Sequence, residues 1–169
     1  MTGVESTMDK KALITKFELE LRQAIKDFEE GKSIPLEKFD WGLPPFRIAE
    51  SQAEYRVQNE AWTEIKLALN VSQQMTSIYT YIANNLANEP ASYATRAIIE
   101  NKISNISIFP NSGTFITSVI DGISEIFSSV QRRIAKRYVI TYKYFEEIDT
   151  VLITHIFLQM QDYGKIFQK

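Results

Sequence analysis

The sequence predicts an α+β fold in which one strand and a helical hairpin precede three consecutive strands, in the order β-α-α-β-β-β with an antiparallel sheet. Apolar and polar residues alternate over residues 63–70, as in a half-buried strand. Residues 73–87 and 90–107 carry apolar side chains at helical spacing. Residues 130–158 contain three runs of β-branched and aromatic residues separated by short turns. An N-terminal helix and an extended arm are expected before this unit.

The composition is that of one globular domain, or of a small domain with a long appendage. The chain has 169 residues, of which 44% are hydrophobic and 12% aromatic, so it can bury a core. It contains no cysteine and one histidine, which excludes a disulfide framework and gives no reason to expect a metal site or a cofactor. No apolar run approaches the roughly 18 residues needed to cross a bilayer, and residues 1–11 lack an apolar signal segment. We therefore expect a cytoplasmic protein with no membrane partner.

The formal net charge of −2 hides an uneven distribution. Residues 1–60 hold 9 Lys and Arg against 12 Asp and Glu, whereas residues 61–169 hold 10 against 9. Residues 131–143 contain five basic side chains and no acidic one: Arg132, Arg133, Lys136, Arg137 and Lys143. Such a cluster fits either a surface that binds an anionic partner or a solvated strand edge, and both interpretations stay open.

Residues 9–30 are predicted to form an amphipathic helix. Its apolar stripe consists of Ile14, Phe17, Leu21, Ala24, Ile25 and Phe28. Gly31 is well placed to end the helix. Because an isolated helix would expose this stripe to water, we expect the helix to dock on another part of the molecule.

The helical periodicity disappears in residues 32–45. Three prolines in this segment remove backbone donors and oppose a regular helix: Pro35, Pro44 and Pro45. The segment is predicted to be an extended arm that places Phe39 and Trp41 in a groove, or else a well-packed loop of a single domain. Residues 48–59 are polar and are expected to form a short connecting helix.

The following elements are expected to form the helical hairpin. In the strand at 63–70, Ile65, Leu67 and Leu69 share the buried face. Ser72 is a candidate cap for the helix at 73–87. The side chains expected to point inward from that helix are Met75, Ile78, Ile82 and Leu86. Pro90 suits the first turn of the second helix, whose inward set is expected to be Ala94, Ala97, Ile98, Ile103 and Ile106.

The remaining segments alternate between turns and strands. Residues 109–113 form a turn, and residues 115–129 fit either a loop or two short strands. Strands are predicted at about 130–136, 138–145 and 150–158, with a hairpin turn at 146–149. A strict alternation in the last strand would place Val151, Ile153, His155 and Phe157 on one face and Leu152, Thr154, Ile156 and Leu158 on the other. Both faces are largely apolar, which is typical of a central strand.

Four short motifs follow one another along residues 62–167: Ile-Tyr-x-Tyr-Ile at 78–82, Phe-Pro-x-x-Gly at 109–113, Tyr-x-Ile-x-Tyr at 138–142 and His-x-Phe-x-x-x-Gln-Asp-Tyr at 155–163. In this order and spacing they resemble the RelE/ParE toxins of bacterial type II toxin–antitoxin systems. The resemblance implies the RelE/ParE-like fold, with a helical hairpin and an antiparallel sheet. It also implies a toxin that inhibits growth.

The first 50 residues resemble the C-terminal arm of a cognate antitoxin, through a helix followed by Gly-Lys-x-Ile-Pro-Leu-Glu and Phe-Asp-Trp-Gly-Leu-Pro. The two resemblances together imply an antitoxin-like helix and arm at 1–60 fused to a toxin domain at 61–169. The arm would then neutralise the toxin in cis. Its expected contacts are Phe17, Leu21, Ile25, Phe28, Phe39 and Trp41. A separate antitoxin and a homo-oligomer are compatible with the same sequence.

The resemblance implies one of two targets, the ribosome with its mRNA or DNA gyrase. A ribosome-dependent endoribonuclease needs a base, a cation for the developing phosphorane charge and an acid. The resemblance assigns the cation to Arg133 and a substrate contact to Tyr163, and His155 is the one side chain that titrates near neutral pH. Residues expected to bind RNA or another target are Arg132, Lys136, Arg137 and Gln161.

Other interpretations of the same residues stay open. His155 and Tyr163 fit core positions as well as catalytic ones. Val139 stands where several ribonuclease members carry arginine, and no basic residue lies between His155 and Lys165. These departures weaken the nuclease assignment. A gyrase inhibitor, an inactive toxin fusion and a non-catalytic protein-interaction module are therefore the alternatives.

Overall fold

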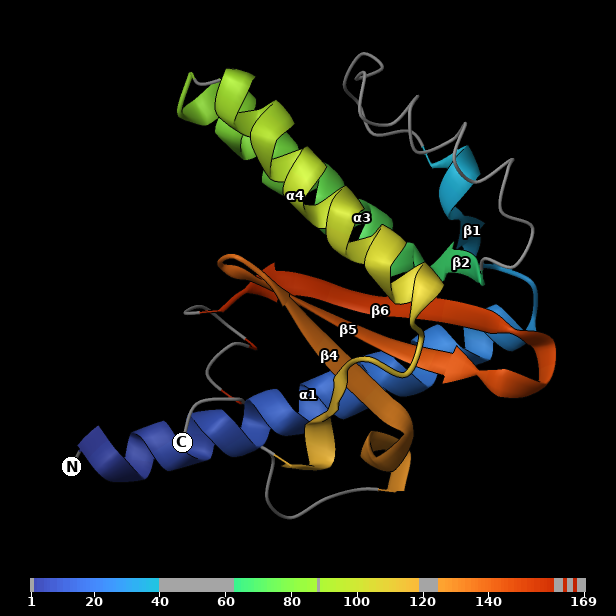
Figure 1. Cartoon of the computed structure of the whole chain (residues 1–169). Helices are drawn as coiled ribbons and strands as arrows, with labels where there is room; N and C mark the ends of the chain where they lie inside the picture. The colour runs from blue at the N-terminus through green and yellow to red at the C-terminus, as the bar shows by residue number, and fades with distance from the viewer. Residues whose placement is uncertain are drawn as a thin grey trace.

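The computed structural model describes residues 2–39, 63–87, 89–118 and 125–159, together with residues 163 and 166. In this part of the chain a six-stranded mixed sheet forms the central layer. A helical hairpin covers one face of the sheet and the N-terminal helix covers the other (Figure 1). The predicted α+β class is confirmed. The expected connecting helix, Trp41, Gln161 and the boundary between the two predicted domains lie outside the described residues.

The sheet has the strand order β1-β2-β6-β5-β4-β3. Its strands are β1 (Ile34–Pro35), β2 (Glu64–Leu67), β3 (Thr114–Phe115), β4 (Val130–Ala135), β5 (Tyr138–Phe145) and β6 (Thr150–Leu158). The last three were predicted within one or two residues, whereas β1 and β3 are short edge strands that were not. The prediction of a wholly antiparallel sheet is wrong, because β2 runs parallel to β6. The helical hairpin between them allows β2 and β4 to run in the same direction. Because β5 is antiparallel to both β4 and β6, β6 also runs in that direction.

In the described part of the chain three longer helices flank the sheet: α1 (Thr2–Glu29), α3 (Leu69–Thr80), which continues into the π-helical turn η2 (Tyr81–Asn85), and α4 (Glu89–Ile108). Short 3-10 turns complete the described elements: η1 (Leu36–Lys38), η3 (Ile116–Ser118), η4 (Glu125–Ser129) and η5 (Glu146–Ile148). The turn predicted between β5 and β6 is η5 with Asp149, which has a left-handed backbone.

The end of α1 follows from one glycine. Gly31 has a φ of +77°, which carries no steric penalty in the absence of a Cβ atom. Its N–H donates to the Phe28 carbonyl at 3.0 Å, and the Lys32 N–H donates to the Asp27 carbonyl at 2.8 Å. These are the two bonds of a Schellman motif, which satisfies carbonyls at a helix end. The predicted stop at Gly31 is confirmed.

The junction between β2 and α3 differs from the prediction. The strand ends at Leu67, and Leu69 already belongs to α3 with 40% of its surface exposed. Ala68 rather than Ser72 precedes the helix, and the Ser72 hydroxyl donates back to the Leu69 carbonyl at 2.7 Å. Two leucines separated by one residue fit the end of a strand as well as the start of a helix, so the sequence pattern could not locate this junction.

The buried stripes of the hairpin are also shifted from those predicted. On α3 the buried residues are Val71, Met75 and Tyr79, whereas Leu86 is 56% exposed. On α4, Ile103 and Ile106 are buried as predicted, but Ala94 is exposed. Ser92, Arg96 and Ile99 of the same helix are buried although they were not predicted to be. The tip of the hairpin stands away from the sheet (Figure 1). Apolar residues near the tip therefore have no sheet beneath them.

A β-bulge in β6 breaks the alternation that the sequence predicts. Thr141 of β5 pairs with His155, but the next residue, Tyr142, pairs with Ile153, so Thr154 is an extra residue. Residues that pair across strands share a face of the sheet. Ile153 and His155 therefore face opposite sides, contrary to the prediction. The predicted central position of β6 is confirmed, since it lies between β2 and β5 with residues 150–157 buried.

Two of the sequence motifs meet where the turn at 109–113 contacts the sheet. The Gly113 N–H donates to the Tyr142 hydroxyl at 2.9 Å and to Gln131 Oε1 at 3.1 Å. The Gln131 amide in turn donates to the Pro110 carbonyl at 3.3 Å. These bonds fasten the turn that follows α4 to strands β4 and β5.

Candidate functional site

Three polar side chains form a row across the sheet face that α1 covers. Arg132 of β4 pairs with Thr141 of β5, which pairs with His155 of β6. We call these residues the α1-facing row. Because neighbouring strands lie about 4.8 Å apart, the backbones of Arg132 and His155 are about 10 Å apart. The row places one predicted cation on the same face as the single histidine.

Arg133, the predicted catalytic cation, lies on the opposite face. It pairs with Ile140, which in turn pairs with Ile156 on the hairpin side of the sheet. Its guanidinium donates to the Ser112 hydroxyl in the turn after α4. Successive residues of a strand point to opposite faces, so the expected site of Arg133 with His155 is not assembled. Arg132, the preceding residue of β4, lies on the same face of the sheet as His155.

His155 and Tyr163 are brought together beneath α1. His155 is fully buried, and its Nε2 lies 2.8 Å from Oε2 of Glu20. The Phe17 ring lies 4.5 Å from the imidazole and 5.1 Å from the Tyr163 ring, measured between centroids. The imidazole and the Tyr163 ring are 5.4 Å apart. Two of the three predicted catalytic residues therefore share one site, and α1 closes it.

The electrostatics favour a neutral histidine next to an ionised carboxylate. Burial lowers the pKa of His155, and the hydrogen bond and negative charge of Glu20 offset this only in part. Burial raises the pKa of Glu20, but the hydrogen bond from His155 and the positive charge of Lys16 act against that rise, and the pKa is lowered overall. An ionised carboxylate only accepts hydrogen bonds, so we assign the donor to the Nε2–H of His155. The Nδ1 atom has no partner among the described residues.

These pKa shifts predict that acid destabilises the protein. A lowered pKa of His155 in the folded state means that stability falls as the pH drops below about 6.5. A lowered pKa of Glu20 removes further stability as the pH drops below about 4.5. Glu20→Gln keeps an acceptor but removes the charge. We expect it to lower the free energy of unfolding by about 1 kcal/mol at pH 7, a modest value because the Glu20 side chain is 32% exposed.

Urea unfolding of the parent and the variant at pH 7, 5.5 and 3 measures this effect. The difference between the two proteins should not shrink from pH 7 to pH 5.5, because the Glu20 charge favours a protonated His155 in the parent. It should shrink at pH 3, where Glu20 of the parent begins to take up a proton. Glu18→Gln is the matched control, since Glu18 pairs with Arg22 on the surface of the same helix. It should change the stability by less than about 0.5 kcal/mol. A pH-independent difference for Glu20→Gln would contradict the assigned ion–histidine contact.

Most of the residues predicted to contact the rest of the molecule from the N-terminal segment are buried, wholly or in part. Phe17 and Leu21 are fully buried. Ile25 and Phe28 are partly buried, and the Phe28 ring lies 4.6 Å from that of Phe145. Phe39 is buried beside the β1 edge. Residues 32–39 thus lie at the sheet edge farthest from β4, and α1 is the element that covers His155.

Two other predicted binding residues lie at the end of a groove on the hairpin side. Lys136 and Arg137 are exposed in the β4–β5 turn, where Lys136 has a φ of +56°. The groove beside them has a volume of about 790 Å³. We call it the hairpin groove; it is lined mainly by Ile78, Ile82, Leu86, Ala94, Ile98, Leu158, Lys136, Arg137 and Tyr138.

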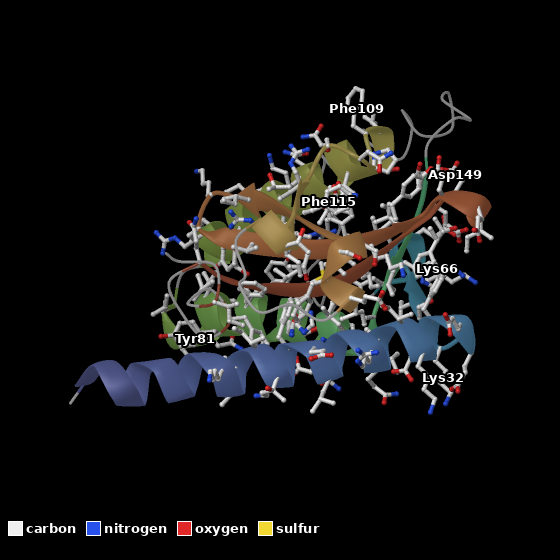
Figure 2. The ribbon with its side chains drawn as sticks, turned by 90° about the horizontal axis from the view of Figure 1, so that it is seen from below. Lys32, Lys66, Tyr81, Phe109, Phe115 and Asp149 are labelled. Atoms are coloured by element: carbon white, nitrogen blue, oxygen red, sulfur yellow. The ribbon has the colours of Figure 1, made fainter. Side chains whose placement is uncertain are left out.

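Sequence patterns did not indicate this groove, because its apolar side chains fit a core stripe equally well. Tyr81, which also lines the groove and is 53% exposed, lies at the opposite end of the molecule from Lys32, Lys66 and Asp149 (Figure 2). An exposed tyrosine within the Ile-Tyr-x-Tyr-Ile motif is the one feature that could have indicated a surface rather than a core.

Comparison with known proteins gives no relative for this chain. No family model matches it, no curated protein matches it, and no solved structure matches it. Within the described ranges, no helix is both long and apolar enough to cross a bilayer. The same part of the chain contains no group of three or more His, Asp or Glu side chains that could hold a metal ion.

Proposed function

We propose that the chain is a growth-inhibiting protein of the RelE/ParE toxin type whose working surface is the α1-facing row, held inactive by α1. The observation that carries the proposal is the contact of α1 with His155 and Tyr163. Glu20 binds the imidazole at 2.8 Å, and Phe17 packs on both rings. A target would have to displace α1 to reach these side chains.

The order of elements supports the same proposal. Apart from the two-residue edge strand β3, one strand, a helical hairpin and three strands follow one another from β2 to β6, which is the order that the resemblance of the sequence motifs implies. The resemblance remains the reason for naming this class of toxin, and the strand order alone does not define an activity.

Among toxin mechanisms, the geometry favours binding of a target over RNA cleavage. Arg133 lies on the face opposite His155, and His155 is neutral and fully buried. The cation and the proton-transfer group of a nuclease site therefore do not converge on one substrate position. We favour inhibition of gyrase by binding, with ribosome-dependent mRNA cleavage as the second mechanism.

The proposal is tested by expressing residues 63–169 in bacteria alone, with residues 1–39 in trans, and within the full chain. The fragment alone should arrest growth, while the full chain should not, and the second fragment should restore growth. Transcript cleavage in the arrested cells would indicate a nuclease. A DNA-damage response without transcript cleavage would indicate gyrase inhibition.

Two further sets of variants test the same proposal independently of each other. Arg132→Ala in the 63–169 fragment should relieve the arrest more than Arg133→Ala, since Arg132 lies on the α1-facing row. In the full chain, Leu21→Glu should weaken the contact of α1 and slow growth even if the isolated fragment is insoluble. A soluble, folded fragment that leaves growth unchanged would refute the proposal.

The second candidate is a non-catalytic interaction module in which α1 completes the fold. The continuity of the core favours it, because Phe17 and Leu21 belong to one buried cluster with Ile116, Phe127 and Val139. In that case residues 63–169 would not fold alone. Circular dichroism of the purified fragment, with and without residues 1–39, distinguishes the two functions.

A further inference from the structure

The hairpin groove joins an apolar channel to a positively charged end. Its walls are the facing sides of α3 with η2 and of α4, and Leu158 lies among its lining. Residues 77–86 follow the groove over about 13 Å, at the rise of a helix. The volume of about 790 Å³ lies within the usual range of small-molecule sites, roughly 300–1,000 Å³.

The charges at the end of the groove are uncompensated among the described residues. Neither Lys136 nor Arg137 forms an ion pair with another residue that the structure describes, and no acidic side chain is found in the described lining. Burial raises the pKa of the Tyr138 hydroxyl, and the positive charge of Arg137 acts against that rise. Arg137 and Tyr138 both belong to the lining of the groove, so this cation lies at the wall of the groove. A cationic end next to an apolar channel is complementary to a molecule with an anionic head and an apolar tail.

We propose that the hairpin groove binds a single-chain carboxylate amphiphile, with the tail between α3 and α4 and the carboxylate on Lys136 and Arg137. The tail removes the exposed surfaces of Ile82 and Leu86 from water, which is the main source of affinity. The two cations supply orientation and discrimination by charge. This site lies on the hairpin side of the sheet, so it stands independently of the growth-inhibiting function proposed for the α1-facing row.

A small amphiphile fits this site better than a protein segment does. A stable protein interface buries about 800 Å² on each partner, whereas the large hydrophobic side chains in the described lining of the groove that are exposed are Tyr81 and Leu86. A carboxylate head also matches two adjacent cations in one turn without needing further charges along the groove. Binding of an acidic amphipathic peptide in place of the amphiphile is treated as an opposing result below.

The test is calorimetric titration of the full chain with sodium dodecanoate below its micellar concentration. We expect saturable binding of one molecule per chain, weakened by added salt because the head group pairs with exposed cations. Dodecyltrimethylammonium has the same tail with the opposite charge, and acetate has the head without the tail. Neither should bind measurably.

Variants locate the site. Ala94→Trp fills the groove from an exposed position of α4 and should abolish binding. The double change Lys136→Gln with Arg137→Gln should weaken dodecanoate binding about three- to tenfold, as expected for two exposed ion pairs. Lys26→Gln on α1 removes one exposed cation elsewhere and should leave the binding unchanged.

Four results would overturn the proposal: no saturable binding of dodecanoate, equal binding of dodecyltrimethylammonium, full binding by the Ala94→Trp variant in its folded state, or capture of an acidic amphipathic peptide without binding of dodecanoate. Circular dichroism of each variant confirms that it is folded. The growth experiment can fail while this titration succeeds, since the two sites lie on different faces of the sheet.

Discussion

Replacing Phe17 by alanine is expected to lower the free energy of unfolding by about 3–5 kcal/mol, the usual range for a phenylalanine removed from a core. Phe17 is fully buried in the middle of α1. Its ring contacts those of Phe127, His155, Phe157 and Tyr163, with centroid distances between 4.5 and 6.3 Å. The change would leave a cavity at the point where α1 docks on the sheet. Urea unfolding followed by circular dichroism measures the loss.

Leu19→Ala on the same helix provides the matched control. Leu19 is 63% exposed, although it lies only two residues from Phe17. Its replacement should change the stability by less than about 0.5 kcal/mol, since alanine also has the higher helix propensity. Similar losses for the two variants would contradict the docking of α1 through its buried stripe.

The Phe17 variant also bears on the proposed restraint. A weakened contact of α1 would raise the fraction of molecules in which His155 is accessible. If the growth-inhibiting function is correct, cells that express the full-length Phe17→Ala protein should grow more slowly than cells that express the Leu19→Ala protein. If α1 only completes the fold, the Phe17→Ala protein should lose stability without slowing growth.

Gly113→Ala is expected to destabilise the fold by about 2–3 kcal/mol, through overpacking and the loss of a hydrogen bond. A Cβ atom at this position would lie 2.5 Å from the Tyr142 hydroxyl and 2.9 Å from the Arg132 carbonyl oxygen. The carbonyl belongs to β4 and has little freedom to move. The turn would have to separate from the sheet, which breaks the bond between the Gly113 N–H and Tyr142.

A double-mutant cycle with Tyr142→Phe tests the cause. Phenylalanine lacks the hydroxyl that lies nearest to the added methyl group, while Gln131 Oε1 still accepts from the Gly113 N–H. The loss caused by Gly113→Ala should therefore be about 1 kcal/mol smaller in the Tyr142→Phe background. Equal losses in both backgrounds would show that the contact with the hydroxyl is not the source of the effect.

The sequence predicted those parts of the fold that depend on local pattern. The stripe from Ile14 to Phe28 repeats at helical spacing, and the stop at Gly31 needs only a residue that tolerates positive φ. The strands that became β4, β5 and β6 could be located because their β-branched and aromatic runs end at short turns. The central position of β6 followed from its two apolar faces.

The faces of β6 were predicted only in part, for a reason that lies in one residue. Thr154 is an extra residue in β6, and its hydroxyl lies 2.7 Å from that of Thr141 on the neighbouring strand. A bulge cannot be recognised from the alternation of apolar and polar residues. The residues of β6 before Thr154 therefore face the opposite side from the one that a strict alternation with the residues after it predicts. For this reason the sequence placed His155 on the same face as Ile153, when it lies beneath α1. The choice between Arg132 and Arg133 depends on the same kind of one-residue register.

The sequence by itself determined the α+β class, the order of the longer elements from β2 to β6 and the need for α1 to dock, because these follow from periodicity and from the exclusion of apolar stripes from water. Only the tertiary structure decided that β2 pairs in parallel with β6, that Glu20 meets His155, and that Ile82 and Leu86 line an open groove instead of a core. Each of these depends on contacts between residues far apart in the chain. Their free energies are set by how whole elements pack, and no local pattern records that packing.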